Sequence, residues 1–266
     1  VSLHYSGATS NGTLGVGWTL PTPTISIDTR WGVPRYDPQY ETEQYIVNGE
    51  PILLRNANGT ALSLPYQEND YQHRKTGAVQ FFARNTKNQD RVIRYGTNPS
   101  NYYWAVTDRN GITTYYGRTF NPDSLDNKSI DENSIVRTAN GCIAYWAATA
   151  SVDIHGNYIL YTNEKYGNNV YIKQIDYTGN ITTHAPPVYR VQLQYRERED
   201  ITTSGRLGVL QTENRLLCHL LVQYLDPNKK HPDYTDNLTA YYLQYTEPKE
   251  VTLYKSRLAE VVKLDS

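Results

Sequence analysis

The chain has 266 residues, and its 26 basic and 27 acidic side chains give a net charge of −1. This length suits one large all-β domain as well as two smaller domains. The balanced charge provides no field that would attract nucleic acid or an anionic membrane. No apolar run approaches the roughly 18 residues of a membrane helix, and the N-terminus has no charged-then-apolar leader. We therefore expect no nucleic-acid partner and no transmembrane segment.

Tyrosine dominates the aromatic residues, with 25 Tyr against 3 Phe, and methionine is absent. A tyrosine packs its ring on one side and hydrogen-bonds at its tip, so it suits thin sheets with little fully dry interior. This composition favours a β-shell over a thick helical core.

The first element is a glycine-rich stretch that ends on a tryptophan. Only a residue without a Cβ takes a positive φ at low cost or lets another group approach its backbone closely. The spacing therefore predicts a tight turn whose backbone packs against a buried indole. The residues concerned are Gly12, Gly15, Gly17 and Trp18. Further on, in Pro34-Arg35-Tyr36, pairing or stacking of the arginine is a simpler expectation than ligand binding.

Turn formers then recur between short alternating stretches. Asn-Gly and Gly-Asn pairs tolerate the positive φ of tight hairpins, and in an Asp-x-x-Gly turn the carboxylate accepts local backbone N–H bonds. The sequence therefore predicts antiparallel hairpins with these sites at their turns. The pairs begin at Asn11, Asn48, Asn58, Asn110, Asn140, Gly156, Gly167 and Gly179. The Asp-x-x-Gly turns run from Asp108 to Gly111, Asp153 to Gly156 and Asp176 to Gly179.

Period-two alternation predicts strands at 189–196, 216–224 and 241–245, each with one wet face. The run 142–150 mixes helix-favouring alanines with strand-favouring residues, and we interpret it as a strand. The segments 120–133 and 226–237 lack an apolar period and carry turn formers, which predicts surface loops.

Two cysteines, Cys142 and Cys218, match no metal or redox spacing. Lone thiols are more often small buried hydrophobes than partners in a disulfide, and the sequence leaves their pairing open.

These motifs, taken in order, resemble the SpvB-like N-terminal domain family, which occurs in SpvB-type proteins and in the B subunits of bacterial toxin complexes. In that family a glycine-rich turn, a tryptophan, a proline-punctuated strand and a Gly-x-Pro-Arg-Tyr stretch open the domain, as residues 12–36 do here. The hairpins at 103–117 and 146–161 and the segment 195–258 follow the family's order. The Asp-x-x-Gly repeats resemble the YD/RHS repeats that line a hollow β-shell.

The resemblance covers nearly the whole chain, so residues 1–266 are expected to form one such β domain, a fragment of a larger chain. It implies an all-β fold of antiparallel hairpins that form curved sheets or part of a β-shell, with little helix. Two departures, the polar segment 226–237 and Arg196 where the family tends to carry an acid, concern the local charge network and leave the fold expectation intact.

The sharpest enzyme-like pattern is Glu197-Arg198-Glu199, because ADP-ribosyltransferases use a Glu-x-Glu turn. Here the nearest Ser/Thr stretch, 202–204, follows the glutamates, whereas the enzymes' Ser-Thr-Ser element precedes theirs. We therefore interpret the tripeptide as a solvated strand end. Because Arg198 and Asp200 lie two residues apart on one strand face, we expect them to pair with neighbouring strands and to fix register.

No other pattern carries recognisable chemistry. The histidines and cysteines lack metal-ligand spacing, and both the Gly-x-Ser-x-Gly elbow and the dinucleotide fingerprint are missing. The acidic residues between 123 and 132 could supply oxygen ligands to calcium, but the glycine of a calcium loop is absent. We expect no catalytic residue, no metal and no cofactor.

The resemblance implies a non-catalytic scaffold domain of a secreted or cell-surface bacterial protein. Its implied partners are the remainder of the parent chain, with a β-propeller and an RHS-type shell, and an enclosed effector. Two alternatives are a carbohydrate-binding or adhesive module with exposed aromatic platforms, and a glycan-active enzyme, for which no carboxylate pair is distinguishable. Strand-like ends at 1–5 and 258–264 predict sheet edges that the parent chain covers.

Overall fold

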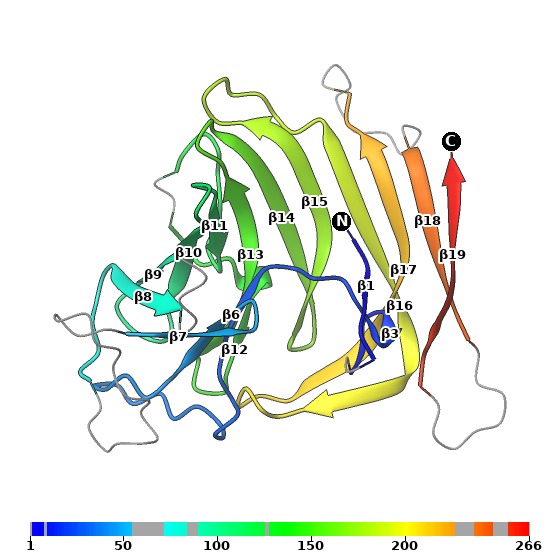
Figure 1. Cartoon of the computed structure of the whole chain (residues 1–266). Coiled ribbons are helices and arrows are strands. Elements are labelled where there is room, and N and C mark those ends of the chain that lie inside the picture. The colour runs from blue at the N-terminus through cyan, green and yellow to red at the C-terminus, as the bar shows by residue number, and fades with distance from the viewer. Residues whose placement is uncertain are drawn as a thin grey trace.

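A computed structural model describes residues 2–7, 10–54, 72–83, 90–125, 128–226, 237–246 and 255–265. In this part of the chain the helical structure is a single 3-10 turn, η1 (Glu132–Ser134), and every other element is a strand. The prediction of an all-β fold built from antiparallel hairpins is confirmed (Figure 1). None of the described helical structure is long and apolar enough to cross a membrane.

The strands follow one another along the chain with mostly short connections. They are β1 (His4–Tyr5), β2 (Asn11–Gly12), β3 (Gly15–Val16), β4 (Trp18–Thr19), β5 (Thr24–Ile27), β6 (Tyr45–Val47), β7 (Glu50–Leu53), β8 (Val79–Ala83), β9 (Arg91–Tyr95), β10 (Tyr103–Thr107), β11 (Thr113–Tyr116), β12 (Ile135–Arg137), β13 (Ile143–Val152), β14 (Asn157–Tyr166), β15 (Asn169–Asn180), β16 (Tyr189–Ser204), β17 (Gln211–Tyr224), β18 (Asn237–Tyr245) and β19 (Leu258–Asp265).

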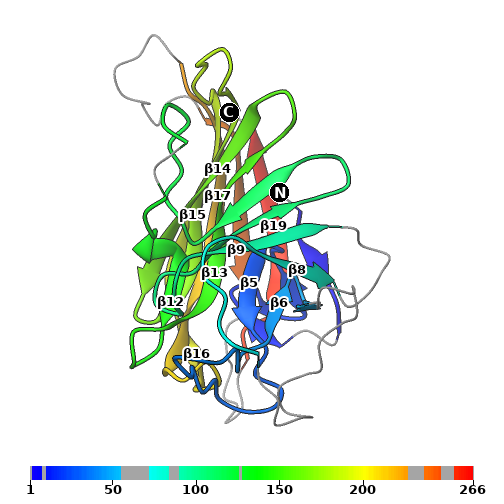
Figure 2. The same cartoon turned by 90° about the vertical axis from the view of Figure 1, so that its left-hand side faces the viewer.

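One half of the molecule is a closed barrel. Strands β5 to β11 pair in chain order, and β13 closes the ring because it pairs with both β5 and β11. Each of these pairings is antiparallel. Figure 2 shows the barrel strands from the side, in front of the long strands.

The barrel interior is filled by aromatic and branched side chains. Trp104 and Trp146 are fully buried, with ring centroids 5.8 Å apart. The Trp146 Nε1–H donates to the Tyr102 carbonyl over 2.6 Å, so the one polar atom of this indole is satisfied. Gly117, with a φ of 73°, lies directly against the Trp146 ring. This contact between a glycine and an indole was not predicted from the sequence.

The other half is an open, curved sheet (Figure 1). It continues from β13 through β14, β15, β16, β17 and β18 to β19, and each strand pairs antiparallel with the next. A second apolar cluster, including Leu193, Leu216 and Leu243, lies on one face of this sheet. The N-terminal segment crosses that face and buries Leu14 in the cluster.

The strands predicted from alternation are confirmed at 189–196 and 241–245. The run 142–150, interpreted as a strand in spite of its alanines, lies in β13 from residue 143 onward. In β17 the alternation is interrupted, because the register shifts where Tyr195 pairs with Leu217 and Gln194 with His219. This bulge places Leu216 and Leu217 both inside, each 1% exposed, and the predicted single buried face of 216–224 is wrong at this point.

Most predicted hairpin turns are confirmed. Asn48 and Gly49, with φ of 48° and 88°, join β6 and β7, as expected for a type I′ turn. The Asp108 Oδ1 accepts the Ile112 N–H over 2.9 Å between β10 and β11. The Asp153 Oδ1 accepts the Asn157 N–H over 2.9 Å between β13 and β14. The pairs beginning at Asn140 and Gly167 lie at turns as well.

Three turn predictions are wrong, those at Asn11, at Asp176 to Gly179 and at the pair that begins at Gly179, because these residues lie within strands. Asn11 and Gly12 form β2, and the turn follows at residues 13–14. Asp176 to Gly179 lies inside β15, where Thr178 takes a φ of 74° at a register shift. The site is therefore a bulge and leaves the strand direction unchanged. The pair at Asn58 lies outside the described residues.

The predicted loop 120–133 is irregular in its described part up to residue 131, and its last two residues lie in η1. Of the second predicted loop, 226–237, residues 227–236 lie outside the described residues. Cys142 and Cys218 are both free thiols.

Candidate functional site

The long hairpin of β16 and β17 has a bend near its middle. Glu197 pairs with Arg215 and the next pair is Thr202 with Glu213, so residues 198–201 face Asn214 alone. Such a large bulge bends a hairpin sharply. Beyond it the hairpin turns beneath the barrel (Figure 1), where Leu207 packs against the barrel core.

Arg198 and Asp200 lie in this bulge, with side chains 0% and 4% exposed. The guanidinium makes two parallel bonds to the carboxylate, Nε to Oδ1 and Nη2 to Oδ2, each 2.8 Å long. Its other contacts reach the N-terminal segment: Nη1 donates to the Gly12 carbonyl over 2.8 Å and Nη2 to the Asn11 Oδ1 over 2.6 Å. The pair therefore holds β2 against the bend.

Asp200 also binds the segment before β19. It accepts the Ser256 N–H over 2.6 Å and the Ser256 hydroxyl over 2.7 Å, and it accepts the Asn11 Nδ2 over 2.8 Å. Burial alone would raise the pKa of this carboxyl, but the hydrogen bonds from Arg198, Ser256 and Asn11 outweigh it and hold the pKa well below its usual range. The expected pairing occurs, although it joins distant segments across a bulge and does not fix a strand register.

The glycine motif also contacts Ser256, the residue that binds Asp200. Gly15 has a φ of 77° and lies against the Ser256 carbonyl, which accepts the Val16 N–H over 2.9 Å. A side chain at position 15 would overlap that carbonyl. Gly12, Gly15, Arg198 and Asp200, which the sequence presents as two separate motifs, thus form one site.

Trp18 is only half-buried, so the prediction of a buried indole is wrong. The residue that lies against Gly17 is Tyr5, whose ring centroid is 5.3 Å from that of Trp18. Trp18 packs against the apolar cluster of the open sheet and stays partly exposed, because β1 and β4 form a two-stranded layer on the surface of that sheet.

The remaining motif residues lie elsewhere. Tyr36, with a φ of 54°, packs against the barrel core, while Arg35 is exposed and has no partner among the described residues. The two Asp-x-x-Gly turns meet each other, because Gly111 lies against the Ile154 side chain of the second turn. Pro34 is half-buried in the segment that precedes Tyr36.

A buried charge cluster in the barrel was not predicted. Arg94 is 0% exposed, its Nη1 donates to the Glu41 Oε2 over 2.8 Å, and its guanidinium lies 4.0 Å from the Tyr102 ring centre. Arg74 donates to Glu41 over 3.3 Å and to Glu43 over 2.9 Å. Burial raises the pKa of Glu43 in spite of Arg74. No local pattern signals this cluster, because its members come from separate segments.

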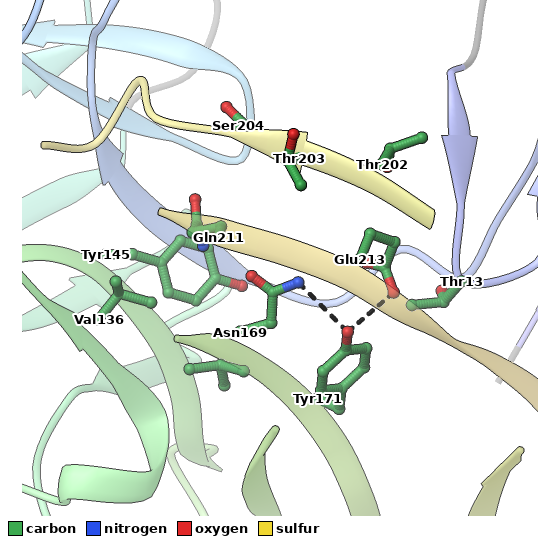
Figure 3. A pocket seen from close by; sticks show the side chains of 11 residues that line it. Thr13, Val136, Tyr145, Asn169, Tyr171, Thr202, Thr203, Ser204, Gln211 and Glu213 are labelled. Carbon is green, nitrogen blue, oxygen red and sulfur yellow. Dashed lines mark hydrogen bonds between the residues drawn. The ribbon is translucent and has the colours of Figure 1, made fainter. Parts of the chain in front are cut away.

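A cavity of about 290 Å³ lies beside the bend (Figure 3). The Tyr171 hydroxyl donates to the Glu213 Oε1 over 2.8 Å and accepts the Asn169 Nδ2 over 3.2 Å. Burial raises the pKa of Glu213. The cavity is lined by Thr13, Val136, Tyr145, Asn169, Val170, Tyr171, Thr202, Thr203, Ser204, Gln211 and Glu213.

The Glu-x-Glu pattern does not contribute to this cavity. Glu197 has a side chain 82% exposed and pairs with Arg215 over 3.4 Å, and Glu199 is exposed. Both glutamates are therefore solvated, as expected. In the described residues no three His, Cys, Asp or Glu side chains gather as metal ligands would.

Comparisons with solved structures identify the same fold in toxin proteins. The N-terminal domain of effector protein SpvB from Salmonella typhimurium strain LT2 superposes with a TM-score of 0.73 at 18% identity, over 99% of this chain and 93% of that one. The structure of TcdB2-TccC3-Cdc42 gives a TM-score of 0.72 at 17% identity, over 97% of this chain and 14% of that one. The Photorhabdus luminescens Tc holotoxin pore gives 0.71 at 16% identity, with the same coverage.

Sequence comparison points the same way. The proteins named mono(ADP-ribosyl)transferase SpvB from Salmonella choleraesuis and Salmonella enteritidis are each 26% identical over 186 residues, or 68% of this chain. This chain spans only 28% of the length of these relatives. The family model described as Salmonella virulence plasmid 65kDa B protein matches residues 1–242. Since that match covers most of the sequence, the chain belongs to the SpvB family.

Proposed function

We propose that this chain is a non-catalytic scaffold domain of a secreted toxin-complex B or SpvB-type protein, and that its curved sheet contributes to a shell that encloses or delivers an effector. The observation that carries the proposal is the outer edge of the open sheet. Strand β19 pairs with β18 on one side and with no described strand on the other. Val261 and Leu264 on it are 43% and 50% exposed. Natural proteins normally charge, shorten or cover such an edge.

The toxin structures support the same role. The fold makes up 14% of the matched chain in each of the TcdB2-TccC3 structures, so in those chains it is one part of a much larger assembly. We propose that the partners of this domain are the remainder of a parent chain, with a β-propeller and an RHS-type shell, and an enclosed effector. A secreted or cell-surface location follows from that role.

A non-enzymatic role fits the described residues. Transferase chemistry on NAD needs an arginine, a Ser/Thr strand and a Glu-x-Glu turn around one ligand, and here Glu197 and Glu199 are solvated outside the cavity. We expect the purified chain to leave NAD intact. Hydrolysis of NAD that Glu199→Gln abolishes would contradict this assignment.

The direct test of the shell is purification of the full-length parent protein. We expect an enclosed polypeptide to co-purify with it and to resist a protease that digests the same polypeptide when it is free. An effector segment that is digested equally fast in both forms would contradict the proposal.

A further inference from the structure

The cavity beside the bend is assembled from four parts of the chain that lie far apart in the sequence. Thr13 comes from the N-terminal turn, Tyr145 from the barrel strand β13, Tyr171 from β15, and Thr203 and Glu213 from the bent ends of β16 and β17 (Figure 3). The bulge held by Arg198 and Asp200 sets the position of these ends. The cavity therefore depends on the same contacts that shape the domain.

Several hydrogen-bond acceptors in the cavity have no partner among the described residues. The Asn169 Nδ2 donates to the Tyr171 hydroxyl and to the Thr212 carbonyl, and the Oδ1 of Asn169 is left unpaired. Glu213 accepts Tyr171 with Oε1, which leaves Oε2 unpaired. Gln211 donates over 3.4 Å to the Asn168 carbonyl, which leaves its own carbonyl oxygen unpaired.

The remaining lining is neutral and amphipathic. Tyr145 is half-buried and contributes an aromatic ring, whereas Tyr171 is 3% exposed and contributes its hydroxyl group. Thr202, Thr203 and Ser204 carry hydroxyl groups that both donate and accept, and because they are consecutive in β16 these groups point alternately to its two faces. No lysine or arginine is among the lining residues, and Glu213 would repel an anion. This chemistry suits a neutral ligand that has apolar ring faces and many hydroxyl groups. A volume of about 290 Å³ has room for one sugar ring rather than a chain of them.

We propose that this cavity binds one neutral monosaccharide unit, whose hydroxyls donate to Glu213, Asn169 and Gln211 and whose ring packs against Tyr145. The site is independent of the scaffold role and adds recognition of a glycan to it. Glu213 is the sole carboxylate among the described lining residues, whereas glycoside hydrolysis uses a pair, so we propose a site that binds the sugar without cleaving it.

The test is a titration of the 266-residue chain with methyl glycosides of glucose, galactose and mannose and with N-acetylglucosamine. Binding is followed by NMR through the side-chain amide signals of Asn169 and Gln211. We expect at least one sugar to shift both signals at concentrations up to about 10 mM, the range that reveals a Kd near 1 mM. Gln211→Ala removes an unpaired acceptor, and Glu213→Gln removes the charge of another. Each variant should therefore bind the sugar about tenfold more weakly.

Glu197→Gln is the matched control, because this carboxylate is exposed and lies outside the cavity. It should leave the affinity for the sugar unchanged. The affinity of a variant is compared with that of the wild type only if the two proteins have the same melting temperature. Gln211→Ala keeps the test interpretable if Glu213→Gln fails to fold, since among the described residues the Gln211 side chain makes a single, long hydrogen bond. Absence of any shift, binding that survives both cavity variants, or binding of ammonium or phosphate ions in place of the sugars would each overturn the proposal.

Discussion

At the residue scale, the Arg198–Asp200 pair is buried and forms a doubly hydrogen-bonded ion pair that also satisfies backbone groups of two other segments. A buried ion pair adds little stability over an apolar pair, but removal of one partner leaves an uncompensated charge in the interior. The bend is therefore held in place by hydrogen bonds among three segments, which are the bulge in β16, the N-terminal segment and the segment before β19.

Arg198→Ala is expected to lower the free energy of unfolding by about 3–5 kcal/mol, because Asp200 would remain buried without its cation. Denaturant unfolding measures this change. Arg35→Ala is the control, since Arg35 is exposed and has no partner among the described residues, and it should change stability by less than about 0.5 kcal/mol. A loss below about 1 kcal/mol for Arg198→Ala would show that the network does not hold the bend.

The stabilisation from Asp200 depends on pH. Its pKa is lowered in the folded protein, whereas the unfolded value is about 3.9. The contribution is therefore present in full above about pH 4 and is lost as the pH falls through the lower folded pKa. Unfolding of the wild type and of Asp200→Asn should differ most at neutral pH, and the difference should shrink below pH 4. A difference that is constant from pH 7 to pH 3 would exclude this carboxylate as the cause.

Gly15→Ala tests the close approach of the N-terminal motif to Ser256. Gly15 and Gly141 have nearly the same φ, 77° and 78°, but Gly141 faces open space. Gly141→Ala should cost only the left-handed backbone penalty, about 1–2 kcal/mol. Gly15→Ala should cost clearly more, because its methyl group would also overlap the Ser256 carbonyl. Equal losses in thermal or denaturant unfolding would mean that the contact with Ser256 is not specific.

At the element scale, local turn chemistry predicted most hairpins, because a positive φ at Asn48-Gly49 or Gly111 depends on the residues of the turn itself. It failed at Asp176, because the carboxylate that would cap a turn pairs with Arg190 over 2.7 Å across β15 and β16. Alternation likewise failed at the bulge that turns both Leu216 and Leu217 inside, because the register of β17 against β16 shifts there. The sequence presents the Arg198 site as two motifs, and only the fold brings them together.

The residues next to a tryptophan in the sequence likewise do not show how far the fold will bury its ring, as Trp146 and Trp18 illustrate. Trp146 lies inside the barrel, where strands surround it, whereas Trp18 packs against the apolar cluster of the open sheet and stays partly exposed. We expect Trp146→Ala to destabilise by about 3–5 kcal/mol and Trp18→Ala by about 1–2 kcal/mol. Denaturant midpoints of the two variants measure both values. A loss for Trp18→Ala that equals or exceeds that of Trp146→Ala would contradict the half-buried position.

At the scale of the whole molecule, a closed half and an open half meet at β13. The barrel has no free edge, because β13 joins β5 and β11. The open sheet is covered on one face by the N-terminal segment but presents β19 at its outer edge. A free edge of this kind favours pairing with another strand, and we propose that the parent protein supplies that strand.

Hydrogen exchange at β19, measured in the 266-residue chain and in the full-length parent protein, tests this scaffold role most directly. The account predicts that β19 amides which face away from β18 exchange rapidly in the isolated chain and are protected in the parent. Strand β10, which has a partner on both sides within the barrel, serves as the internal control and should be equally protected in both. Equal exchange at β19 in the two proteins would contradict the proposal that this domain is one wall of a larger shell.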